Sequence, residues 1–141
     1  MAVNLNPIFA KRPRFKPTVF AAADGTNWKQ IFAPGTEGSR ISKIIISTTK
    51  TTSFYALLRI NNGTDQSILG HITINGSAGQ GTVAVVSGLN RGNLPWLEID
   101  ANGNPFFDAN VNMNIEMKLS ASLSGTEEVN VTVGANEYED N

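Results

Sequence analysis

The sequence contains no cysteine and a single histidine, His71, among its 141 residues. Without cysteine there is no disulfide framework, no cysteine-ligated zinc site and no thiol nucleophile. With one histidine, metal sites that need two histidines are also excluded. No serine stands in a nucleophile-elbow context, and sequence alone fixes no separation between two carboxylates, so no catalytic constellation can be assembled. We therefore expect neither an enzyme nor a bound cofactor or metal.

Charged residues are also scarce, at 16%, and they nearly cancel to a formal net charge of -1. A near-neutral chain is poorly suited to coating nucleic acid. The longest apolar runs, such as residues 44–46, are far too short to span a bilayer. The basic N-terminal residues are followed by no apolar stretch of signal-peptide length. We expect a protein that is made in the cytoplasm and binds no membrane, and nucleic acid is a disfavoured partner.

Uncharged polar residues are abundant instead, with 16 Asn, 12 Thr and 10 Ser beside 13 Gly. They alternate with apolar residues at period two. The clearest case is residues 111–121, where Val, Met, Ile, Met, Leu and Ala occupy every second position. Such alternation is typical of a strand with one buried and one solvated face. The polar residues therefore mark the wet faces and turns of a β protein.

Eight or nine such segments follow one another, separated by turn signals such as Asn61-Asn62-Gly63. We expect strands over 18–23, 28–33, 40–49, 54–60, 68–74, 94–100, 111–121 and 129–133, with a short one at 82–86. Segment 40–49 is β-branched nearly throughout, which suits burial on both faces, and the last two strands form a hairpin or lie in one sheet. The spacing predicts an all-β fold, an antiparallel β-sandwich of jelly-roll type or an immunoglobulin-like one.

The first 17 residues differ from the rest, because they hold three of the six prolines and four basic residues but no acid. Proline disfavours helices and central strands, so we expect an extended basic N-terminal arm over 1–17 and a sandwich domain over 18–141. The arm docks on its own body, on a neighbouring copy or on another protein. A nucleic-acid contact is the weaker interpretation, since four cations make a small basic surface. The candidate partner-binding residues are Ile8, Phe9, Lys11, Arg12, Arg14, Phe15 and Lys16.

Two further groups of residues have a possible binding role. Asp100-Ala-Asn102-Gly-Asn104 resembles the start of a calcium loop, but the pattern then fails, and a turn is the better interpretation. Aromatic residues suited to a sugar-binding platform are Trp28, Tyr55, Trp96, Phe106 and Phe107, although such residues are more often core or interface residues.

Short motifs over most of the chain resemble a family of small β-rich virion proteins of tailed phages and prophages. The motifs are Asn6-Pro7-Ile8-Phe9 with Lys11-Arg12-Pro13-Arg14, Ala23-Asp24-Gly25-Thr26, Gly35-Thr36-Glu37-Gly38-Ser39-Arg40-Ile41 and Leu58-Arg59-Ile60-Asn61-Asn62-Gly63. The C-terminal residues 131–138 are also similar. This sequence departs from the family at residues 94–107, a long segment for which the family motifs provide no counterpart.

The resemblance implies a structural particle component without a catalytic residue, most plausibly a capsid decoration (cement) protein. Such a protein is located on the capsid surface of the virion and docks on the major capsid protein or another virion protein. We also expect a homo-oligomer, with a trimer favoured. The alternative is a tail- or fibre-associated module that binds a host glycan or another virion protein.

Overall fold

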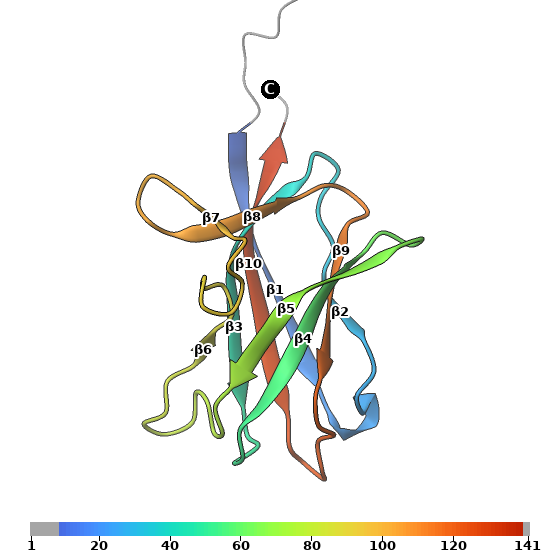
Figure 1. Cartoon of the computed structure of the whole chain (residues 1–141), viewed down its shortest axis with the longest axis vertical. Coiled ribbons are helices and arrows are strands. Elements are labelled where there is room, and N and C mark those ends of the chain that lie inside the picture. Colours follow the sequence, from blue (N-terminus) through green and yellow to red (C-terminus); the bar gives the residue numbers. More distant parts are fainter. Residues whose placement is uncertain (1–8, 140–141) are drawn as a thin grey trace, which may run out of the picture.

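The fold consists of two antiparallel sheets in a computed structural model that describes residues 9–139, and the side chains of residues 12–138. Figure 1 shows the long strands of the two sheets. Their bounds are β1 Phe9–Phe20, β2 Lys29–Phe32, β3 Ser39–Thr48, β4 Phe54–Asn61, β5 Gln66–Ile74, β6 Val86–Ser87, β7 Glu98–Ile99, β8 Pro105–Ala109, β9 Asn114–Leu119 and β10 Val129–Glu139. A short 3-10 helix, η1 Ala22–Asp24, connects β1 to β2. Among the described residues, no helix has the length and apolarity that crossing a bilayer requires.

The strand order is β1-β10-β3-β8-β7 in the larger sheet, where β6 also pairs with β3, and β2-β9-β4-β5 in the smaller one. The predicted all-β antiparallel sandwich is confirmed. The jelly-roll subtype and a separate N-terminal arm are not confirmed. Our prediction for the two C-terminal strands is wrong, since β9 and β10 belong to different sheets. The loop between them, which contains Gly125, carries the chain from one sheet to the other instead of closing a hairpin.

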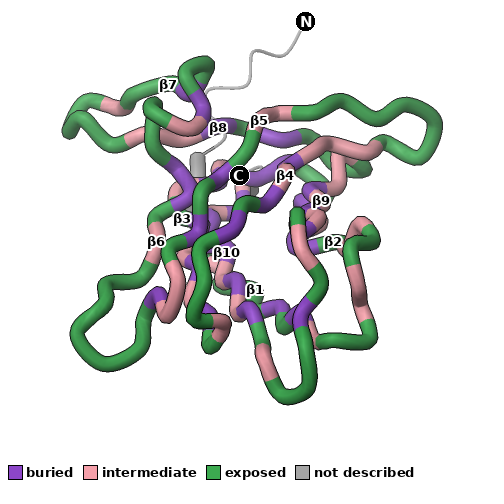
Figure 2. Tube along the Cα trace, turned by 60° about the horizontal axis from the view of Figure 1, so that its bottom comes forward, coloured by how far each residue is buried: buried purple, intermediate pink, exposed green. Residues whose placement is uncertain are grey.

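The core forms where the alternating apolar faces of the two sheets meet. On β9, Ile115, Met117 and Leu119 are buried, and on β10 every second residue from Val129 is buried in the same way. Figure 2 shows that buried positions lie along the strands and that the connecting loops are largely exposed. This alternation is what packing two sheets face to face requires.

Strand β3 alternates too, although its sequence suits burial on both sides. Ile44 and Ile46 are buried, whereas Ile45 between them is only partly covered. The outer face of the larger sheet therefore has no second layer over it within the described residues. The expected burial of 40–49 on both faces is wrong for this reason.

Strand β1 is an edge strand that pairs with β10 along its length, from Phe9 opposite Glu139 to Phe20 opposite Val129. The expected boundary at residue 17 falls inside this strand, so residues 9–17 are part of the sheet. Within this structure these residues thus pack on the chain's own β10. Because β1 lies at the edge of the sheet, its prolines are tolerated. Pro13 and Pro17 both occupy odd-numbered positions of the strand, where no backbone N–H is needed for a hydrogen bond to β10.

The region between β5 and β9 differs most from the sequence prediction. Strands β6 and β7 have two residues each, shorter than expected, while β8 was not predicted at all. In β8, Phe107 lies opposite Ile41 of β3, whereas Phe106 lies opposite Glu98 of β7. A five-residue strand that begins at a proline has too few alternations to be recognised.

Candidate docking site

The alternation of β1 divides the expected docking residues between two faces. Thr18 and Phe20 are buried between the sheets. Arg14 and Lys16 stand at alternate positions of the same strand and therefore point to the same face as Thr18 and Phe20. Phe15 has the opposite parity and is 61% exposed on the outer face of the larger sheet. Arg14 and Lys16 therefore cannot act with Phe15 as a single contact.

Four of the seven candidate residues have described side chains. Arg12, Phe15 and Lys16 are exposed, and Arg14 is half-buried. Ile8 lies outside the described residues. The backbone of Phe9 and Lys11 belongs to β1, but their side chains are likewise outside the description. The Lys16 ammonium donates a 3.2 Å hydrogen bond to the carbonyl of Pro17.

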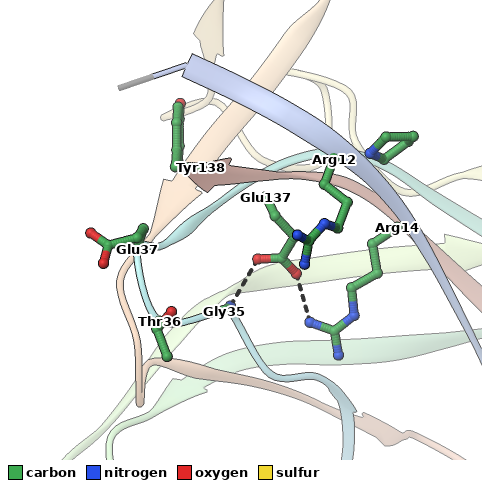
Figure 3. Close-up of a pocket in the computed structure, with 8 residues that line it drawn as sticks. Arg12, Arg14, Gly35, Thr36, Glu37, Glu137 and Tyr138 are labelled. Carbon is green, nitrogen blue, oxygen red and sulfur yellow. Dashed lines mark hydrogen bonds and ion pairs between the residues drawn. The ribbon is translucent and has the colours of Figure 1, made fainter. Parts of the chain in front are cut away.

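The basic face of β1 borders a cleft of about 670 Å³ where β1 begins and β10 ends (Figure 3). The connection between β2 and β3 forms the opposite wall. The lining residues come from these three segments: Arg12, Pro13, Arg14, Gly35, Thr36, Glu37, Glu137 and Tyr138.

Glu137 holds the three segments together from the wall of the cleft. Its carboxylate accepts hydrogen bonds from Nη1 of Arg14 at 2.7 Å, from Oγ of Ser39 at 2.8 Å and from the amide of Gly35 at 3.1 Å. Figure 3 shows the contacts with Arg14 and Gly35. A Cβ at residue 35 would overlap Oε2 of Glu137, so a larger residue there would displace the carboxylate from these contacts.

Burial raises the pKa of Glu137, but hydrogen bonds from Arg14 and Ser39, the charge of Arg14 and the amide of Gly35 outweigh it. The net pKa of the carboxyl lies below its usual value, so Glu137 is ionised at neutral pH. Arg14 also donates to the carbonyl of Ala33 at 2.8 Å, and its guanidinium lies 4.6 Å from the centre of the Phe32 ring. The Arg14 cation thus has several partners within the chain.

Sequence reasoning missed the pairing of Arg14 with Glu137, which joins residues 123 positions apart. A signal was present nonetheless. Glu137 shares the parity of Val129, Val131 and Val133, so continuing the predicted strand would have placed this carboxylate on the buried face. A buried carboxylate requires a cation or several donors, and the N-terminal arginines were available.

The aromatic candidates do not form one platform. On the outer face of the smaller sheet, the Trp28 ring lies 4.1 Å from the guanidinium of Arg59, which is itself paired with Glu116 at 2.7 Å. Tyr55 lies on the same sheet with its ring edge-on to His71, at 6.1 Å between centroids. His71 is an exposed strand residue there, beside a shallow hollow of about 270 Å³.

The other aromatic candidates lie around β7 and β8. Trp96 packs edge-on against Phe107 at 5.3 Å between ring centroids and donates a hydrogen bond to the carbonyl of Leu69. Phe106 stacks beneath Arg40, 4.0 Å from its guanidinium carbon. All three rings pack in the β7–β8 region, but only Phe107 is buried in the core, and Trp96 is 41% exposed.

The loop at Asp100 is a turn. One Asp100 carboxylate oxygen accepts hydrogen bonds from the amides of Asn102 and Asn104, both at 2.9 Å. Across residues 9–139, no three His, Cys, Asp or Glu side chains gather where they could hold a metal ion.

Comparison with known proteins adds no assignment. No family model matches the sequence, and no curated protein with a similar sequence was found.

Proposed function

We propose that this chain is a structural protein of a tailed-phage particle that decorates and stabilises the capsid by docking on the major capsid protein. In this role it binds and does not catalyse. The chain is made in the host cytoplasm and then occupies the capsid surface. The sequence motifs that resemble phage virion proteins motivate the proposal.

The observation that supports it most is the exposed basic edge of β1 beside the cleft. Arg12 and Lys16 are exposed there, and Arg14 is paired with Glu137. The strand backbone is already ordered by pairing with β10, so docking costs less conformational entropy than ordering a free arm would. A partner that fits this edge is a protein surface with exposed carboxylates.

A point substitution tests the proposal better than a truncation. Removing residues 1–16 would delete eight of the twelve residues of β1 (9–16 of 9–20) and uncover β10. Lys16→Glu instead reverses one exposed charge. Its matched control is Arg91→Glu, because each cation is exposed and donates one hydrogen bond to a carbonyl, at 3.2 Å for Lys16 and 3.3 Å for Arg91.

The assay is co-sedimentation of the purified chain with phage capsids assembled without it. We expect wild-type protein to bind and to weaken as salt is added. Lys16→Glu should bind about tenfold more weakly, which corresponds to about 1.4 kcal/mol, while Arg91→Glu binds as wild type. If the wild-type protein does not sediment with the capsids, the proposal is refuted. If labelled protein binds only to the tail of the phage particle, the alternative module is favoured. If both variants bind equally, the role of the basic edge is refuted.

A further inference from the structure

Asparagine is followed directly by glycine at three places in the chain, Asn62-Gly63, Asn75-Gly76 and Asn102-Gly103. In such a pair the backbone nitrogen of the glycine can attack the side-chain amide, because glycine has no Cβ to hinder the approach. All three pairs lie in turns or loops, and each of the three asparagines is exposed. The contacts that hold each pair therefore decide how readily it reacts.

Asn62-Gly63 is held at both reacting groups. Oδ1 of Asn62 accepts hydrogen bonds from the amides of Thr64 at 2.9 Å and of Asp65 at 2.7 Å. The amide of Gly63 donates a hydrogen bond to Oδ1 of Asn61 at 2.9 Å. Three hydrogen bonds must therefore break before the Gly63 nitrogen can reach Cγ of Asn62, which makes the reactive arrangement rare.

Asn75-Gly76 is held by packing. The amide of Gly76 donates a hydrogen bond to Oγ of Ser53 at 3.2 Å. A Cβ at residue 76 would overlap the carbonyl oxygen of Thr51, so the two backbone segments lie close against each other. The backbone rotation that the reaction needs would have to displace residues 51–53.

Asn102-Gly103 is held only by its own loop. Residues 101–104 are all exposed, and the loop between β7 and β8 projects from the side of the molecule (Figure 1). Within residues 9–139, the Asn102 side chain forms no hydrogen bond. Apart from its chain neighbours, no atom lies within 4 Å of where a Cβ of Gly103 would be. The Gly103 amide donates one hydrogen bond, to the carbonyl of Asp100 at 3.0 Å, so a single local contact restrains the reacting atoms.

We infer that Asn102 is a site of spontaneous deamidation. The Gly103 nitrogen gives up its proton and forms a bond to Cγ of Asn102. The bond from Cγ to Nδ2 breaks, and Nδ2 takes up a proton and leaves as ammonia. Water then adds to one of the two carbonyl carbons of the resulting succinimide and opens the ring. The products are aspartate and isoaspartate, in which the backbone runs through the former side chain.

The reaction changes the turn that joins β7 to β8. Both products add a negative charge near the Asp100 carboxylate, which already accepts a hydrogen bond from the amide of residue 102. Isoaspartate also lengthens the backbone of the turn by one carbon atom. Strand β7 has only two residues, Glu98 opposite Phe106 and Ile99 opposite Pro105, so a distorted turn should release it from β8. The modification accumulates with the age of the molecule and is independent of the proposed capsid binding.

The test is peptide mass spectrometry of the folded wild-type chain after incubation in mildly alkaline buffer, with chromatographic separation of the aspartate and isoaspartate peptides. We expect residue 102 to convert at least about tenfold faster than residues 62 and 75 in the same sample, because fewer contacts must break there. In urea the three residues should convert at similar rates, since each then belongs to an unfolded chain.

Asn102→Gln is the matched variant, because glutamine keeps the amide but would have to close a larger ring. Aged wild-type protein should be cut by protease within 98–104 severalfold faster than fresh protein, whereas Asn102→Gln should not change with age. An unmodified Asn102 in aged folded protein, or equal conversion of all three asparagines in the folded chain, would overturn the inference. Equal protease resistance of aged and fresh wild type would overturn the release of β7.

Discussion

Replacing Glu137 by glutamine removes one charge from the cleft while keeping the shape of the side chain. The two carboxylate oxygens accept three hydrogen bonds. Oε1 accepts one from Arg14, and Oε2 accepts one each from Ser39 and Gly35. Glutamine turns one of these oxygens into an NH₂ group. In either orientation of the amide, at least one donor then faces another donor.

The expected loss of stability follows from these contacts. A hydrogen bond to a charged group contributes about 1.5–3 kcal/mol, and the side chain of Arg14 is 37% exposed, so its share is reduced by solvent. We expect Glu137→Gln to lower the free energy of unfolding by about 2 kcal/mol. At about 3 °C per kcal/mol for a chain of this length, the melting temperature falls by about 6 °C at pH 7.

The effect should depend on pH with a defined sign. Because folding lowers the pKa of Glu137, the unfolded chain binds more protons in the interval between the two pKa values. The contribution of the carboxylate is therefore present above the unfolded pKa, about 4.3, and is lost as the pH falls through the folded pKa. Comparing wild type with Glu137→Gln cancels the other acids that titrate in this range.

Calorimetric or circular-dichroism melts from pH 3 to pH 8 provide the measurement. Glu37→Gln is the control, since Glu37 lines the same cleft but is exposed, and it should change stability by less than about 0.5 kcal/mol. Equal melting temperatures of wild type and Glu137→Gln at pH 7 would refute the reasoning. So would a difference that stays constant down to pH 3.

Two other variants probe the sheet edge and the charged outer face of the smaller sheet. Pro13→Thr combined with Pro17→Thr restores two outward amides on β1, so heat-induced light scattering should rise severalfold faster with little change in the melting temperature. An unchanged scattering rate would show that the prolines do not protect the edge. Arg59→Lys removes the planar cation over Trp28 and the 2.7 Å contact with Glu116, and we expect about 1 kcal/mol of lost stability with altered tryptophan fluorescence. Wild-type melting and emission would contradict that expectation.

Local patterns were sufficient to predict the long strands. Six alternations at 111–121 predicted β9, and the turn signal at Asn61-Asn62-Gly63 predicted where β4 ends before it turns into β5. Asn62 forms that turn by accepting hydrogen bonds from the amides of Thr64 and Asp65. In both places one short segment contains all the information that its structure needs.

Long-range partners were not predictable in the same way. Which sheet a strand joins depends on contacts far away in the sequence, so β9 and β10 were wrongly paired although both were recognised as strands. The cleft has the same origin, since Arg14, Gly35 and Glu137 meet only once β1 has paired with β10 and β3 has paired with it from the other side. No local pattern specifies such a meeting.

Strand β1 shows how a correct observation can lead to an incomplete interpretation. Its composition of cations, prolines and apolar residues is typical of a docking arm, and an arm would present them all together. A strand instead turns successive residues to opposite sides, so Arg14 and Lys16 lie on one face while Phe15 and Val19 lie on the other. The electrostatic contact beside the cleft therefore uses only one side of the strand, and Lys16→Glu should impair capsid binding through that side alone.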